Sequence, residues 1–179
     1  MLDNIDAKKV EIWSEDETRV GQQGSLTRMW AKKGTRPRKA KQRQFISIYL
    51  YGAACHKTGQ SYAAVLPYAN TKAMNIFLQG LSQEIKEGKH VALIIDNAGW
   101  HNSNELIVPD NITLIPLPPY SPELNAMEQV WEWIKKRFLY NQCYSDYNDI
   151  VDKVCDAWNH LSSNPDIIKS IIHRKWIHL

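Results

Sequence analysis

Two carboxylates in this sequence follow segments that have the residue pattern of β-strands. Asp16 comes after the alternating, β-rich segment Val10–Ser14, and Asp96 comes after the continuous apolar run Val91–Ile95. A charged side chain beside such a run is costly unless it is paired or coordinates a cation. Both positions are therefore candidates for chemistry that uses carboxylate oxygens.

A third carboxylate, Glu128, lies within residues 123–139, which have helical periodicity. The apolar residues of this segment recur at intervals of three and four: Leu124, Met127, Trp131, Ile134 and Phe138. At about 100° per residue, Glu128 falls roughly 80° from the centre of this stripe, at the border of the buried face. Lys135 falls on the same border two turns later. We interpret Trp131 as a core residue rather than as a base-stacking one.

Asp16, Asp96 and Glu128 are the kind of donor set that Mg²⁺ or Mn²⁺ prefers, because these cations take few carboxylates and keep positions for phosphate and water. Two such ions about 3.5–4 Å apart stabilise both the attacking and the leaving oxygen of a phosphoryl displacement. One ion alone explains binding better than cleavage. The alternative is structural, since a strand-end Asp often caps a loop and a border Glu is usually solvated.

The residues around these carboxylates allow two interpretations each. His101 follows Asp96 by five residues. It either contacts phosphate or supports the metal site, or it is a surface or capping histidine. Glu15 and Glu17 flank Asp16 and could be mistaken for the ligand. On an alternating strand they point away from the face of Asp16, so we rank them second.

The elements that must position these residues alternate between strands and helices. Strand patterns cover residues 10–14, 45–55, 61–66, 91–95 and 112–117, with a short one at 26–31. Helical patterns cover residues 72–86, 123–139, 147–161 and 165–173, with Thr71 as the first N-cap and a short helix starting near Asn102. This order predicts an α/β domain with three layers, in which helices flank a mixed central sheet.

Basic residues are concentrated between Arg28 and Arg43. That stretch holds eight of them and no acidic residue, whereas the whole chain has 22 Lys and Arg against 19 Asp and Glu. A concentrated basic segment on an otherwise acidic body is typical of a polyanion-binding surface, and the alternative is a solvated loop. The candidate nucleic-acid contacts are Arg28, Lys32, Lys33, Arg36, Arg38, Lys39 and Lys135.

Length and composition indicate one globular domain. The chain has 179 residues, 44% of them hydrophobic and 23% charged, which excludes collagen, coiled-coil rods and wholesale disorder. Its three cysteines form no CxxC pair, so a disulfide framework or a Cys-type zinc site is not expected. No apolar run approaches the roughly 18 residues of a membrane span. We therefore expect a soluble, intracellular protein.

Three sequence blocks resemble the DDE transposases, in particular the bacterial insertion-sequence branch of the mariner-like superfamily. The blocks are Asp16-Glu17 after the first strand, the string DNAGWH at 96–101, and the string PPYSPELNAMEQVW at 118–131. The last block is the most specific. The resemblance covers roughly residues 9 to 160, with Ala126 standing where the family usually has Pro.

The resemblance implies a ribonuclease H-like fold in which Asp16, Asp96 and Glu128 bind two Mg²⁺ or Mn²⁺ ions. The implied activity is cleavage of phosphodiester bonds at transposon ends and joining to target DNA. The implied partners are double-stranded DNA and either a second copy or a separately encoded DNA-recognition half, in a bacterial cytoplasm and at its nucleoid. Because the chain begins almost at the first strand, we expect the family's N-terminal helix-turn-helix module to be absent.

Two other functions remain open at this point. The chain could be an inactive transposase remnant that binds DNA without cutting it. It could also be a structural or inhibitory partner of a full-length transposase. The intact set of three acidic residues favours an enzyme, since decay would have struck one of the three positions.

Overall fold

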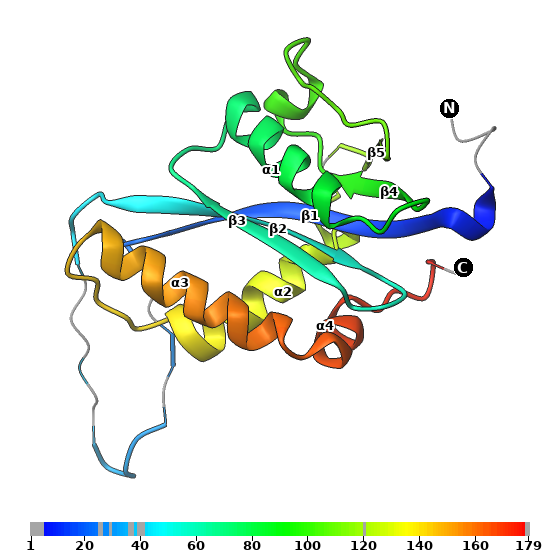
Figure 1. The fold of residues 1–179 in the computed structure, drawn as a ribbon. Helices are drawn as coiled ribbons and strands as arrows, with labels where there is room; N and C mark the ends of the chain where they lie inside the picture. Colours follow the sequence, from blue (N-terminus) through cyan, green and yellow to red (C-terminus); the bar gives the residue numbers. More distant parts are fainter. Residues whose placement is uncertain are drawn as a thin grey trace.

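The computed structural model, which describes residues 6–24, 27–28, 30–35, 38, 42–119 and 121–177, contains one five-stranded mixed sheet (Figure 1). In spatial order the strands are β3 (Ser61–Leu66), β2 (Ser47–Cys55), β1 (Val10–Gly21), β4 (His90–Ile95) and β5 (Ile112–Pro116). β2 runs antiparallel to β1 and β3, while β4 runs parallel to β1 and β5.

Helices cover both faces of this sheet. One face carries α1 (Thr71–Glu84), and the other carries α2 (Met127–Ile134), α3 (Tyr147–Ser162) and α4 (Pro165–Ile172) (Figure 1). The short helical segments are η1 (Ala7–Lys9), η2 (Gly99–Asn102), η3 (Pro122–Leu124) and the π-helical η4 (Lys135–Leu139). This arrangement confirms the predicted three-layer α/β architecture. None of the described helices is long and apolar enough to pass through a bilayer.

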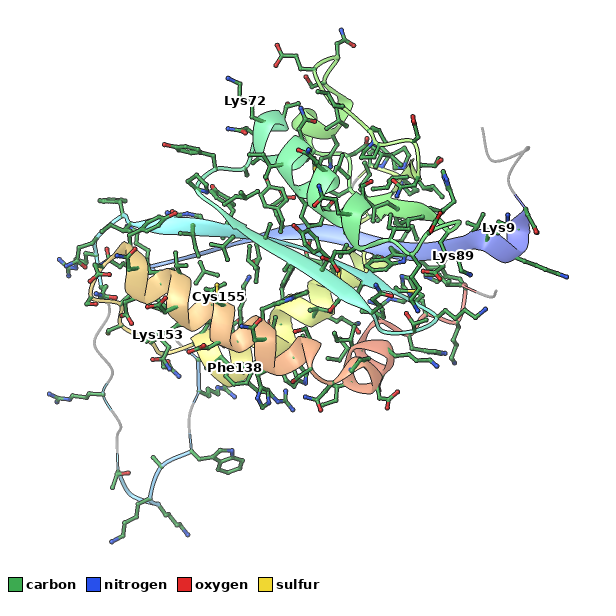
Figure 2. The ribbon with its side chains drawn as sticks, viewed as in Figure 1. Lys9, Lys72, Lys89, Phe138, Lys153 and Cys155 are labelled. Atoms are coloured by element: carbon green, nitrogen blue, oxygen red, sulfur yellow. The ribbon has the colours of Figure 1, made fainter. Side chains whose placement is uncertain are left out.

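Each face of the sheet has its own apolar layer. Figure 2 shows side chains filling the space between the sheet and the helices on either side. On the α1 face, Trp13 of β1 belongs to the same buried cluster as Phe77 of α1. On the opposite face, Val20 of β1 belongs to the cluster that contains Trp131 of α2. β1 is therefore the central strand, and its side chains alternate between the two helical layers.

β1 does not end at Asp16, as the sequence suggested. It continues to Gly21, so that the acidic residues lie in its middle. The reason is its pairing: β2 pairs with β1 as far as Gly21, whereas β4 pairs with it only as far as Ser14. Because β2 satisfies the backbone groups of β1 beyond the point where β4 ends, Asp16 is held on a continuous strand rather than on a loop.

Residues 123–139 do not form the single helix that their periodicity predicted. They divide into the end of η3, then α2 and η4. The Asn125 side-chain oxygen accepts a hydrogen bond from the Met127 N–H (3.1 Å), so α2 starts there. At the other end, the Tyr140 N–H donates to the Lys135 carbonyl five residues back (2.7 Å), which closes the wider π turn.

At α1, the observed N-cap is Asn70 rather than Thr71.

The basic segment between β1 and β2 contains no strand among its described residues. The predicted strand over 26–31 is wrong for Thr27, Arg28, Trp30 and Ala31, which are exposed and lie outside strands. Exposed residues of this kind bury no face that would favour a sheet. Figure 1 shows the described residues 30–35 of this segment lying away from the sheet and helices.

Candidate active site

Asp16 projects from the middle of β1 toward α2. Its Oδ2 accepts a hydrogen bond from the indole N–H of Trp131 (2.9 Å), and both side chains are buried. Space for the indole comes from Gly52 of β2, which lies directly opposite Asp16 in the strand pairing. A Cβ on Gly52 would lie 2.5 Å from Cη2 of Trp131. Gly52 and Trp131 together therefore fix the orientation of the Asp16 carboxylate.

The start of α2 is tied to β1 by one side chain. Asn125 donates from Nδ2 to the carbonyl of Glu15 (2.8 Å) while its Oδ1 accepts the Met127 N–H. Asn125 is itself buried. These two bonds set the first turn of α2, which carries Glu128, beside the part of β1 that carries Asp16.

Asp16 and Glu128 are close enough to repel each other. Burial raises the pKa of Asp16 to about 8, and the negative charge of Glu128 is the next largest cause. The charges of Glu17 and Asp96 act in the same direction, and only the Trp131 hydrogen bond opposes them. None of the groups that shift this pKa carries a positive charge that would compensate the ionised form of Asp16.

Asp96 lies just beyond β4, where the chain turns into η2. Its Oδ1 accepts a hydrogen bond from the Ala98 N–H (2.9 Å) and lies 2.9 Å from Nδ1 of His101. The hydrogen bond from His101 lowers the pKa of Asp96. Burial by itself would lower the pKa of His101, but its hydrogen bonds to Asp96 raise it above the ordinary value. His101 is buried, so it is a supporting partner of Asp96 rather than a surface histidine.

Glu15 and Glu17 face away from Asp16, as the alternation of the strand predicted. Together with His101 they form, among the described residues, a group in which one ligand atom of each side chain lies within 4.8 Å of the others. Asp16, Asp96 and Glu128, all described, do not form such a group. Trp131 holds the Asp16 carboxylate and His101 holds the Asp96 carboxylate, so each carboxylate is turned toward its own partner.

The three predicted ligands fit a hard divalent cation by their chemistry. They offer carboxylate oxygens, the donors that Mg²⁺ and Mn²⁺ prefer. A cation beside Asp16 would also offset the repulsion that raises its pKa. Asp16, Asp96 and Glu128 therefore lie in one electrostatic neighbourhood.

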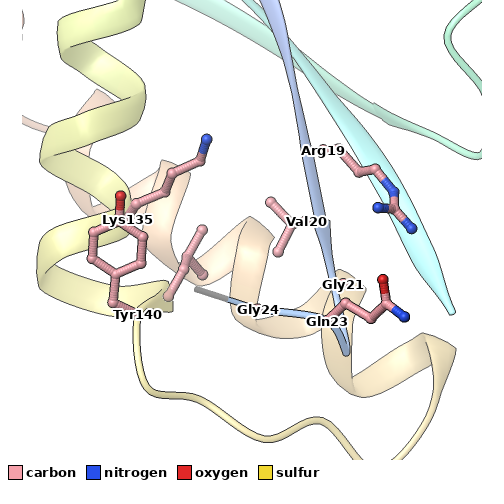
Figure 3. Close-up of a pocket in the computed structure, with 8 residues that line it drawn as sticks. Arg19, Val20, Gly21, Gln23, Gly24, Lys135 and Tyr140 are labelled. Atoms are coloured by element: carbon pink, nitrogen blue, oxygen red, sulfur yellow. The ribbon is translucent and has the colours of Figure 1, made fainter. Parts of the chain in front are cut away.

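Lys135 lies in a small groove two helical turns beyond Glu128. The groove has a volume of about 130 Å³ and runs between β1 and η4, with Arg19 on its β1 side (Figure 3). Arg19 is three residues beyond Asp16 on the strand, and Lys135 is seven beyond Glu128 along the helix. Along the backbone, each of these separations corresponds to about 10 Å. The sequence prediction included Lys135 but did not include Arg19.

The other predicted nucleic-acid contacts lie in the segment between β1 and β2. Arg28, Lys32, Lys33 and Arg38 are exposed, whereas Arg36 and Lys39 lie outside the described residues. The two ends of the segment are fixed to the body of the protein at one point. Gln22 and Gln42 both donate to the Tyr144 carbonyl, at 3.0 and 2.7 Å.

Comparison with known proteins identifies the class to which this fold and site belong. The family model described as DDE superfamily endonuclease matches residues 11–151, and the chain belongs to this family. A relative from Sinorhizobium fredii (strain NBRC 101917 / NGR234), the uncharacterized protein y4pE/y4sA, is 46% identical over 130 residues. The alignment covers 73% of this chain and 96% of the relative.

Solved structures of the Mos1 transposase have a similar fold. The Mos1 strand transfer complex matches with a TM-score of 0.64 and 18% identity, over 92% of this chain and 50% of the Mos1 chain. The mariner Mos1 paired end complex with Mg matches with a TM-score of 0.64 and 19% identity, over 91% and 51%. The chain thus spans about half the length of the Mos1 chains. The likeness confirms the predicted ribonuclease H-like fold.

Proposed function

We propose that this chain is a metal-dependent DNA endonuclease and strand-transferase that cleaves and joins phosphodiester bonds at transposon ends. The observation that carries the proposal is the neighbourhood of Asp16, Asp96 and Glu128, in which a buried carboxylate is repelled by two others. Membership of the DDE superfamily endonucleases supports it.

Asp16, Asp96 and Glu128 would hold two Mg²⁺ or Mn²⁺ ions. When bound, these cations supply a nucleophile at neutral pH and stabilise charge on the leaving oxygen. The protein's own groups orient the ligands. Trp131 holds the Asp16 carboxylate by its N–H, and His101 keeps Asp96 ionised by its hydrogen bond.

Positive side chains would hold the DNA backbone against this site. Lys135 lines the groove and Arg19 lies on the other side of β1, each about 10 Å along the backbone from one of the carboxylates and within reach of neighbouring phosphates. The exposed basic residues between β1 and β2 would add contacts that do not depend on sequence. We propose that the domain works on double-stranded DNA of a bacterial nucleoid, in the cytoplasm, as a homodimer or with a separately encoded chain that recognises the ends.

The test is metal-dependent nicking of DNA that carries the terminal repeats of the element. We expect nicking by the wild type with Mn²⁺, and a loss of at least about 100-fold in Asp96→Asn and in Glu128→Gln. Glu132→Gln is the matched control, because Glu132 lies one turn beyond Glu128 on α2 and pairs with Lys136 on the surface. If wild type and Asp96→Asn give equal, metal-independent traces of nicking, the chain binds DNA without cutting it.

A further inference from the structure

A second group of possible ligands lies on the opposite side of β1 from Asp16. Glu15 and Glu17 point toward the α1 side of the sheet, where His101 of η2 meets them. One ligand atom from each of these three side chains lies within 4.8 Å of the other two. Because consecutive strand residues face opposite ways, this group is separate from the face that carries Asp16 and Trp131.

Glu15 is the strongest sign that something binds there. The residue is 0% exposed, and neither of its carboxylate oxygens has a hydrogen-bond partner. Oε2 of Glu17 is also buried without a partner. Buried carboxylates are otherwise paired, hydrogen-bonded or bound to a metal ion. Two of them side by side require either a proton or a cation between them.

His101 is oriented as metal-binding histidines are. Its Nδ1 lies 2.9 Å from Oδ1 of Asp96, so a carboxylate fixes the plane of the ring. Metal-ligating histidines usually donate one ring N–H to a carboxylate in this way while the other nitrogen coordinates the cation. In His101 that second nitrogen is Nε2, which is buried.

We propose that Glu15, Glu17 and His101 form a binding site for one divalent transition-metal cation, Zn²⁺ or Mn²⁺. Two carboxylates and an imidazole suit these cations better than Mg²⁺ or Ca²⁺, which rarely take imidazole. Ligand atoms about 2.1 Å from one ion are at most about 4.2 Å apart. The three ligand atoms here lie within 4.8 Å of one another, so they need to move together only slightly to share an ion. The site does not depend on the proposed DNA cleavage.

A cation bound at this site would affect the carboxylates proposed for DNA cleavage through His101. A cation on Nε2 would make Nδ1–H a stronger donor to Asp96. It would also neutralise Glu15 and Glu17, two of the charges that act on the neighbouring carboxylates. The ion would therefore fix the position of Asp96 without being one of the ions that act on DNA.

The experiment uses the full chain with Asp16→Asn and Glu128→Gln, which disable the other site. Equilibrium dialysis against ZnCl₂, and separately MnCl₂, should give one bound equivalent and a higher thermal unfolding midpoint. Adding Glu15→Gln and Glu17→Gln should weaken this binding by at least about tenfold. Glu17→Gln alone is the milder variant, and circular dichroism verifies that each variant folds.

Two outcomes would overturn the proposal. One is that the Asp16→Asn, Glu128→Gln protein binds neither cation, which would mean that Glu15 and Glu17 share a proton instead. The other is that the variants at Glu15 and Glu17 bind as tightly as their parent. Neither outcome depends on whether the wild type cuts DNA, so failure of this proposal and failure of the proposed function are distinguishable.

Discussion

The acidic region around Asp16 and the basic segment between β1 and β2 are held in opposite ways. In the acidic region, Asp16, Asn125 and Trp131 are buried, and each has a hydrogen-bond partner on another element. In the basic segment the described residues from Arg28 to Arg38 are exposed, and Trp30 is 101% exposed. The first region is set by the same packing that folds the protein, whereas the second contributes little to folding.

This difference follows from what each region is proposed to do. Ligands of a catalytic ion need fixed positions, and fixed positions come from packing and from hydrogen bonds behind the ligands. Contacts to a phosphate backbone need charge and reach more than exact placement. Substitutions in the acidic region should therefore change both stability and cleavage, and substitutions in the basic segment should change DNA affinity alone.

The largest effect is expected from Trp131. Trp131→Ala removes a buried aromatic side chain that packs against Trp158 at a ring distance of 6.1 Å, and it removes the donor to Asp16. We expect the free energy of unfolding to fall by about 3–5 kcal/mol in urea denaturation. Trp131→Phe keeps most of the packing but lacks the N–H, so it should lose less stability and still lose nicking. Full nicking by Trp131→Phe would show that Asp16 needs no such orientation.

Asn125→Ala should have the next largest effect. It leaves the buried Glu15 carbonyl without its donor and the Met127 N–H without its acceptor. We expect a loss of about 2 kcal/mol in the free energy of unfolding, since each of the two buried backbone groups left without a partner costs about 1 kcal/mol or more. Asn75→Ala is the control, because that partly exposed side chain bonds backbone atoms of Glu105 and Ile107. Equal losses in both variants would contradict the role given to Asn125.

The contrast between these regions also marks what the sequence could predict. The run Val91–Ile95 has no polar alternation, which is why its burial as β4 could be predicted. The continuation of β1 past Asp16 could not, because charged residues normally end a strand and only the pairing with β2 overrides this. The donor role of Trp131 was also hidden, since an indole in an apolar stripe gives no sign of a partner 115 residues earlier.

The titration of Asp16 gives a smaller, pH-dependent effect. Its pKa is about 8 in the folded protein because of burial, against 3.8 ordinarily. Between these values the folded state holds a proton that the unfolded state has released, so stability falls as pH rises. Without metal, Asp16→Asn should therefore gain about 2 kcal/mol relative to wild type between pH 5 and pH 6.5. Urea denaturation in EDTA at both pH values measures this, and parallel curves would contradict the raised pKa.

Substitutions in the basic segment should have the smallest effect on folding. Lys32→Ala, Lys33→Ala and Arg38→Ala together should change the free energy of unfolding by less than about 0.5 kcal/mol, because all three side chains are exposed. For each phosphate that the variant no longer binds, the dependence of log affinity on log salt should fall by about 0.9, equally for all DNA sequences. Lys57→Ala, Lys72→Ala and Lys86→Ala together, three exposed lysines outside this segment, are the control for the same change in net charge. If the salt dependence stays at its wild-type value, the segment is a solvated loop, and Lys135 and Arg19 must hold the DNA instead.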